Sequence, residues 1–228
     1  MPGPASSALE EAQAKIEACR TSFPVVVGEE PTLRFWAATL FCRTLDGYDA
    51  VLRLHEAGLE IEAWAHSRIA LEHLLAFAWV VAKPRDRERP LKIARNGEGF
   101  LERQKAEMAL FADVPGWDPQ AAAAEIERLD IQGLCRELDG ELAPRVGKFE
   151  VGTAISFSAW YSFFYRGASA VVHPSSVGVE HLVKEVPDGL EVAPGQSAPE
   201  GVVERTLAQV TAAEGIARAT ARWWLATA

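Results

Sequence analysis

The stretch that decides the fold runs from residue 31 to residue 82 and reads PTLRFWAATLFCRTLDGYDAVLRLHEAGLEIEAWAHSRIALEHLLAFAWVVA. Within it, apolar residues recur at spacings of three and four, which is the pattern of one buried face on an amphipathic helix. Pro31 is suited to the first turn of a helix, and Gly58 to the position just after the end of one. The stretch therefore predicts two long helices, over about 31–57 and 60–81, joined by a short turn.

Helical patterns also cover most of the remaining chain. They predict helices over about 89–111, 119–128, 131–138, 153–172 and 202–225. Residues 181–193 differ, because apolar and polar residues alternate on both sides of a Pro-Asp-Gly turn. The fold class that we expect is therefore all-α: a multi-helix bundle with a small β-hairpin annex near residues 181–193.

Composition places the chain among ordinary globular proteins. Of its 228 residues, 49% are hydrophobic and 24% are charged, and a chain of this size can bury a core without a metal or a disulfide. We expect residues 1–30 to be a loose N-terminal lead-in and residues 31–228 to be a single helical domain. Cys19, Cys42 and Cys135 form no CxxC pair, so we expect free thiols in a reducing compartment.

Charge and hydropathy exclude several classes of partner. No segment has the apolar core of a signal peptide or the run of about 18 apolar residues that a membrane span needs, so we expect a cytoplasmic protein without a membrane partner. The net charge of −9 argues against a general coat for nucleic acid. The segment from Lys83 to Arg95, however, contains six basic residues and only two acidic ones. This run could guide RNA to a nearby site, although a solvated helix face is the plainer interpretation.

Metal and cofactor motifs are weak or missing. Glu62, His66 and His73 recur at one and two helical turns, but no HExxH motif or cysteine set accompanies them. The sequence also lacks the phosphate-binding patterns GxGxxG and GxxxxGK[ST] and the nucleophile elbow GxSxG. We therefore expect no cofactor and no metal.

The main candidate site lies on the helix predicted over 153–172, just before Pro174. Arg166, Ser169 and His173 recur at about one helical turn, so we expect them to share a face. An imidazole can act as a general acid or base near neutral pH, and a guanidinium can hold a phosphate. Arg166 and His173 would thus suffice for metal-independent RNA cleavage by the RNA 2′-hydroxyl. The alternative is structural, since His173 could cap the helix end and Arg166 could stack on a ring.

A second pair lies on the earlier predicted helix. Arg68 and Glu72 are one turn apart and can form an ion pair. Leucines surround Glu72, so its carboxylate needs partners, for which the candidates are Arg68, Arg166, Ser169 and His173. Two interpretations stay open. Glu72 orients His173 in an active site, or the Arg–Glu pair joins Ser169 and His173 in a buried network that fixes helix packing.

These motifs resemble a known family. Ser67-Arg68-xxx-Glu72 on an early helix, with Tyr165-xxx-Ser169-xxx-His173-Pro174 on a late one, looks like a widespread, uncharacterised group of bacterial all-α proteins. More distantly, the chain resembles the HEPN superfamily, in which many members carry an Arg, four to six residues, and then a His. The spacing of Arg166 and His173 matches the upper limit. Active members often have a polar residue directly after the Arg, where this chain has Gly167.

The resemblance implies one function, and the residues leave two alternatives. A HEPN-like protein would be a metal-independent ribonuclease and a homodimer with RNA as its partner, in a toxin–antitoxin or phage-defence system. The first alternative is a non-catalytic module that binds a protein partner, with aromatic surface at Trp223 and Trp224. The second is a small-molecule pocket among interior aromatic side chains, namely Trp64, Trp79, Trp160, Tyr161 and Phe164.

Overall fold

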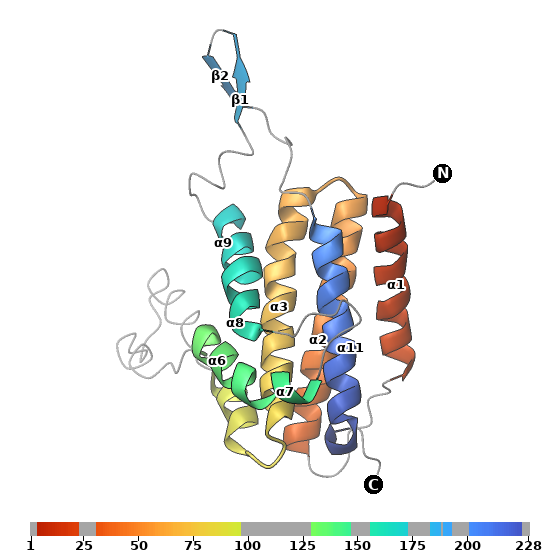
Figure 1. Cartoon of the computed structure of the whole chain (residues 1–228), viewed down its shortest axis with the longest axis vertical. Coiled ribbons are helices and arrows are strands. Elements are labelled where there is room, and N and C mark those ends of the chain that lie inside the picture. Colours follow the sequence, from red (N-terminus) through yellow and green to blue (C-terminus); the bar gives the residue numbers. More distant parts are fainter. Residues whose placement is uncertain are drawn as a thin grey trace, which may run out of the picture.

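The computed structural model describes residues 4–22, 31–96, 129–146, 156–172, 183–187, 189–192 and 201–224. Its long helices stand side by side in an all-α bundle (Figure 1). The helices of this bundle are α1 (Pro4–Ser22), α2 (Pro31–Glu56), α3 (Glu60–Ala82), α6 (Ile131–Glu141), α7 (Ala143–Val146), α8 (Phe157–Trp160), the π-helical turn η1 (Tyr161–Tyr165), α9 (Arg166–Val172) and α11 (Val202–Trp224). Residues 88–96 are also helical.

Helices α2 and α3 form the centre of the bundle and confirm the prediction of two long helices in this stretch. They pack on each other more extensively than any other pair of described elements. Gly58 ends the first helix with a φ of +73°, a left-handed conformation that glycine adopts without strain. The second half of α3 is buried at every position from Leu74 to Ala82, so this helix is the core element on which the others pack.

Helix α1 corrects our expectation for the N-terminal residues. It lies in the stretch that we expected to be a loose lead-in, yet it packs against α11 and α2. Ala12, Ile16 and Cys19 are buried on its inner face, at the spacing of one helical stripe. The stripe is short and two of its members are small, so its hydrophobic signal in the sequence is weak. The boundary of the single domain at residue 31 stays a prediction.

The predicted fold class also needs a correction. The folded body is an all-α bundle, and no strand of the described residues forms part of it. The strands β1 (Val183–Val186) and β2 (Gly189–Val192) pair antiparallel with each other and extend beyond one end of the helices (Figure 1). A lone two-stranded ribbon builds no layer of a core, so the annex is not an element of the fold class.

A buried arginine joins the C-terminal end of α3 to α6. Arg89 is only 3% exposed, and its Nη2 donates hydrogen bonds to Glu137 at 2.9 Å and to Glu141 at 2.8 Å. Its Nη1 donates to the carbonyl of Trp79 at 2.7 Å, and its guanidinium lies 4.8 Å from the centre of that indole ring. This member of the predicted basic run is therefore a structural residue, and its charge is neutralised inside the protein.

Helix α6 in turn fixes where the next helical segment begins. Both carboxylate oxygens of Asp139 accept hydrogen bonds from the first backbone N–H groups of α8, from Phe157 at 2.6 Å and from Ser158 at 3.1 Å. Ser156 caps the same end by accepting from the N–H of Ala159 at 3.1 Å. These contacts satisfy donors that a helix start leaves unpaired, and they set the course of η1 and α9 along α3.

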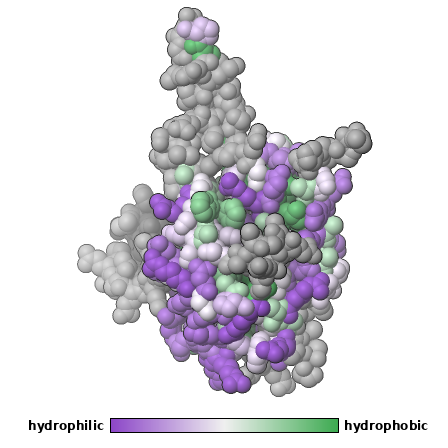
Figure 2. Space-filling model, in the orientation of Figure 1, coloured by the Kyte–Doolittle hydropathy of each residue, from purple (hydrophilic) through white to green (hydrophobic). Residues whose placement is uncertain are grey.

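On the face shown in Figure 2, the described surface is mainly hydrophilic, with small apolar patches. Among the described helices, none combines the length and apolarity that crossing a bilayer requires. The three cysteines form no disulfide, and burial raises the pKa of the Cys19 thiol to about 11 and that of the Cys135 thiol to about 12.

Candidate functional site

Two charged side chains of α3 and one tyrosine of η1 meet between these elements. The Tyr165 hydroxyl donates a hydrogen bond to Oε1 of Glu72 at 2.8 Å and accepts one from Nη2 of Arg68 at 3.0 Å. The same Nη2 lies 3.5 Å from Oε1 of Glu72, so the three side chains form a closed triangle. We call it the Arg–Tyr–Glu triangle. The Arg68 and Glu72 side chains keep exposures of 26% and 35%, so the triangle is half-buried.

Aromatic contacts hold the triangle in place. The guanidinium of Arg68 lies 4.8 Å from the centre of the Tyr165 ring, a cation–π distance. Tyr161 stacks on the other tyrosine with a centroid distance of 5.1 Å and an interplanar angle of 16°. Burial raises the pKa of Tyr165 above its ordinary value, and the hydrogen bond to Glu72 acts in the same direction against that from Arg68. The hydroxyl therefore stays protonated near neutral pH, as a donor to a carboxylate must.

The π-helical turn decides which side chains face α3. Residues Tyr161–Tyr165 adopt this rare geometry, which inserts an extra residue per turn and rotates the following side chains relative to a plain α-helix. Such turns are frequent at functional sites. Here the turn presents Tyr165 to the Arg68–Glu72 pair and leaves Phe163 72% exposed.

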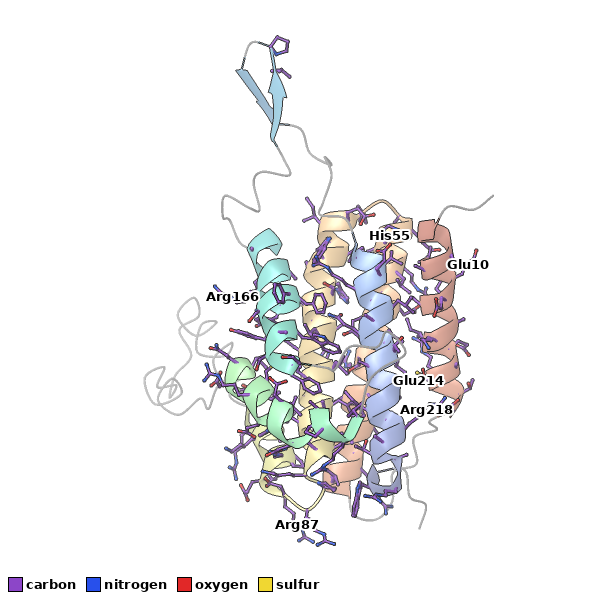
Figure 3. All side chains as sticks on the ribbon, viewed as in Figure 1. Glu10, His55, Arg87, Arg166, Glu214 and Arg218 are labelled. Atoms are coloured by element: carbon purple, nitrogen blue, oxygen red, sulfur yellow. The ribbon has the colours of Figure 1, made fainter. Side chains whose placement is uncertain are left out.

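Arg166 does not join the triangle. It begins α9, it is exposed, and it points away from the bundle (Figure 3). Successive helical residues point about 100° apart, so Arg166 turns outward when Tyr165 faces α3. Among the described residues, Glu72 is thus partnered by Arg68 and Tyr165, and the predicted pairing of Glu72 with Arg166 is not observed.

Ser169 lies on the inner side of α9. Its Oγ is buried and has no hydrogen-bond partner among the described residues, and its neighbour Ala168 is only 1% exposed. The Arg166 side chain is thus exposed while the Ser169 hydroxyl is buried, and the predicted shared site of these two residues stays a prediction. His173 and Pro174 lie outside the described residues, so the pairing of Glu72 with His173 stays a prediction.

The described residues give no support to a metal centre. No group of three or more His, Cys, Asp or Glu side chains in the described ranges could hold a metal ion. His73, one of the two histidines considered as ligands, has a buried Nδ1 without a hydrogen-bond partner among these residues. Burial lowers the pKa of His73, and the nearby Arg43 lowers it further.

Two of the aromatic side chains predicted to line an interior pocket, Trp64 and Trp79, carry an arginine guanidinium over their rings. Trp64 is 2% exposed, and Arg205 lies 4.1 Å from the centre of its ring and 5.5 Å from that of Phe164. Trp79 carries Arg89 on its face at 4.8 Å. The guanidinium groups thus cover one face of each of these two rings.

Sequence reasoning missed the role of Tyr165. The residue is part of the motif Tyr165-xxx-Ser169, and its spacing to Ser169 indicates a shared helical face. A tyrosine on the face that packs against an Arg–Glu pair needs a partner for its hydroxyl, which is the signal that could have found it.

Comparison with known proteins identifies the family. The model of one protein family, described as a family of unknown function (DUF5677), matches residues 34–190. Comparison with curated proteins and with solved structures found no match. The matched range includes α2 from its fourth residue onward, all of α3 and the whole Arg–Tyr–Glu triangle, and it covers more than half of the chain. The chain therefore belongs to the DUF5677 family.

Proposed function

We propose that the protein is a non-catalytic binding module that works as a homodimer, and that the Arg–Tyr–Glu triangle locks η1 and α9 onto α3. One observation carries the proposal: the Tyr165 hydroxyl uses its donor on Glu72 and accepts from Arg68. Nη2 of Arg68 and Oε1 of Glu72 are thus paired with each other and with Tyr165, while the buried Nε of Arg68 has no hydrogen-bond partner among the described residues. A polar network of this kind between two helical segments favours one packing arrangement, which supports a structural role for the triangle.

The binding face of this module is the outer face of η1 and α9, which carries Phe163 and Arg166. Phe163 is the most exposed large apolar side chain of the described residues, at 72%. Arg166 is exposed and makes no ion pair with another described residue. Aromatic residues and arginine are enriched in the cores of protein interfaces.

A second copy of the chain suits this face for two reasons. A two-fold axis beside Phe163 would bring the two aromatic rings together, as in isologous dimers. The chain also carries 32 acidic residues against 23 basic ones, so carboxylates are available on the partner to pair with Arg166.

Sedimentation velocity of the full chain tests the dimer. We expect wild type to sediment as a dimer at micromolar concentration and Phe163→Ser to sediment as a monomer with unchanged helical content. Phe35→Ser is the matched control, since Phe35 is also an exposed phenylalanine, at 42%, but lies on α2. A monomeric wild type, or a dimer that survives in Phe163→Ser, would reject the proposed face.

The second candidate function is a HEPN-like, metal-independent ribonuclease that uses Arg166 and His173. The exposure of Arg166 without an ion-pair partner among the described residues favours it. A free guanidinium on the surface can hold the phosphate of an RNA backbone. In this candidate Arg68, Glu72 and Ser169 are positioning residues, and the same homodimer would bring the two copies of Arg166 near each other.

RNA cleavage in EDTA separates the two candidates. If the protein is a binding module, the wild-type protein should cleave RNA no more than a mock preparation, purified in the same way from cells that lack the gene. A ribonuclease predicts cleavage that both Arg166→Ala and His173→Ala abolish while their thermal unfolding stays like that of wild type. Tyr165→Phe should then retain most of the cleavage, because its hydroxyl positions other groups and touches no substrate.

A further inference from the structure

A cationic cavity lies at the C-terminal end of α3, where α11 also ends and away from the triangle at the middle of α3. Its volume is about 630 Å³, and its lining includes Lys83, Arg85, Arg145, Arg222, Trp223 and Asp86. Glu72 and Ala82 are ten residues apart on α3, which at the helical rise is roughly 15 Å. Figure 3 labels Arg87, from the turn after α3, at this end of the bundle. The cavity is thus separate from the outer face of η1 and α9.

Asp86, the acidic residue that lines this cavity, does not balance the positive charges of the lysine and the arginines around it. Asp86 lies 3.5 Å from Nε of the buried Arg89, and Lys83 forms an ion pair with Glu141. Arg85, Arg145 and Arg222 have no acidic partner among the described residues, although all three line one cavity. In a chain with a net charge of −9, three guanidinium groups at one place without an acidic partner among the described residues need an explanation.

Helix capping explains part of this arrangement. Nη1 of Arg145 donates a hydrogen bond to the carbonyl of Ala82 at 3.0 Å, and Arg222 lies in the last turn of α11. Cations stabilise helix C-termini in this way. Capping does not explain Arg85, which lies beyond the end of α3. The capping hydrogen bond also uses only one of the five N–H donors of Arg145. It holds the Arg145 guanidinium in place for another acceptor.

The cavity also offers an aromatic surface. Trp223 is 37% exposed, and the guanidinium of Arg222 lies 5.0 Å from the centre of its ring. Ala82 and Pro84 add apolar lining beside it. A partly exposed aromatic ring beside cations is the combination on which nucleic-acid bases and their phosphates bind in proteins.

We infer that this cavity binds an organic phosphate that carries a planar ring, of the size of a mononucleotide. Arg85, Arg145 and Arg222 hold the phosphate through charge-assisted hydrogen bonds, and Trp223 stacks on the ring. The volume lies within the range of about 300–1,000 Å³ that is typical of small-ligand sites. A free nucleotide and the terminal nucleotide of an RNA share this chemistry. The inference goes beyond the proposed function and does not depend on it.

Isothermal titration of the full chain with ADP at low ionic strength tests the site. We expect saturable binding of one ADP per chain, at least tenfold weaker in the double variant Arg85→Gln/Arg222→Gln. Trp223→Ala should weaken ADP binding but leave the binding of inorganic pyrophosphate, which has no ring, unchanged. Arg136→Gln is the matched control, because Arg136 is an exposed arginine of α6 outside this cavity, and it should bind ADP within twofold of wild type.

Competition identifies the source of the phosphate. If a 5′-phosphorylated RNA oligomer displaces ADP and its 5′-hydroxyl counterpart does not, the natural ligand is an RNA end. If neither oligomer displaces ADP, the natural ligand is a free nucleotide. Equal displacement by both oligomers would overturn the inference in favour of general polyanion binding. It would also fail if folded wild type bound neither ADP nor pyrophosphate, or if a folded double variant bound ADP as wild type does. These binding measurements do not depend on dimerisation or on RNA cleavage. Those two properties test the proposed function instead.

Discussion

The hydroxyl of Tyr165 joins η1 to Glu72 of α3 through a hydrogen bond of 2.8 Å between residues that are 93 positions apart in the sequence. Arg68 donates to the same oxygen at 3.0 Å, so a single atom links both charged groups of α3 to the later helical segment. Hydrogen bonds to charged groups contribute more to stability than those between neutral groups.

Removal of this hydroxyl should weaken the fold. We expect Tyr165→Phe to lower the free energy of unfolding by about 1–2 kcal/mol, because Glu72 loses a donor while the ring stays in place. Urea unfolding monitored by circular dichroism measures the change. Tyr161→Phe is the control, since Tyr161 stacks on the same ring and makes no hydrogen bond through its hydroxyl with another described residue. If Tyr161→Phe lowered the free energy of unfolding as much as Tyr165→Phe does, the stabilising role of the triangle would be contradicted.

Loss of the buried arginine should be more severe. Only 4% of the Arg89 side chain is exposed, and it faces Glu137, Glu141 and Asp86. Arg89→Ala leaves these carboxylates without their common cation, so we expect a loss of about 3–5 kcal/mol, measured by thermal or urea unfolding. Arg95→Ala should cost less than about 1 kcal/mol, because its ion pair with Glu88 is exposed and 3.8 Å long. Similar losses in both variants would disprove the structural role of Arg89.

Sequence patterns predicted the parts of the fold that depend on local periodicity. The boundaries of α2 and α3 follow from the spacing of apolar residues and from Gly58, and the Arg68–Glu72 pair follows from their separation by one turn. The outward position of Arg166 could not be predicted, because the π-helical turn of η1 changes which side chains face α3.

Burial of α1 and of Arg89 was missed for a different reason. Both depend on contacts between elements far apart in the chain, such as those of Arg89 with α6 and of α1 with α11. A local pattern of three apolar positions, two of them small, carries little information about such packing. In the same way, a basic run does not reveal which of its members is buried.

The stability of the protein should decrease as the pH falls below about 6.5, in part because of His73. Burial, Arg43 and His66 lower the pKa of this imidazole, against the opposite effect of Glu72. In the window between the lowered pKa and the ordinary one, the unfolded chain binds a proton that the folded chain does not. Unfolding is favoured there, so stability is full above the ordinary pKa and decreases as the pH falls through the window.

Urea unfolding at several pH values between 8 and 5 measures this dependence. We expect His73→Gln to be less sensitive to acid than wild type over this range, since glutamine does not titrate. Because carboxylates also titrate at the lower end, the comparison is between wild type and variant at each pH. Identical slopes in the two proteins would exclude His73 as a source of the dependence.

The close contact between α2 and α3 depends on a glycine. A Cβ atom at Gly47 would lie 2.8 Å from Cβ and 3.2 Å from Cα of Ala70, which is closer than real side chains approach. Gly47→Ala improves helix propensity by about 1 kcal/mol, but it forces the two helices apart. We expect a net loss of about 1–3 kcal/mol, measured by urea unfolding.

Two further variants separate this clash from a general effect of alanine. Gly140→Ala should be neutral or stabilising by up to about 1 kcal/mol, because nothing lies within 4 Å of a Cβ atom on that residue of α6. Replacement of Ala70 by glycine in the Gly47→Ala background should recover part of the lost stability, since it removes the nearer of the two clashing atoms. Ala70 lies on α3 between Arg68 and Glu72, so the contact with α2 also fixes the rotation at which α3 presents this pair to Tyr165. If the second substitution recovered nothing, the close approach of the two helices could not be the cause of the loss.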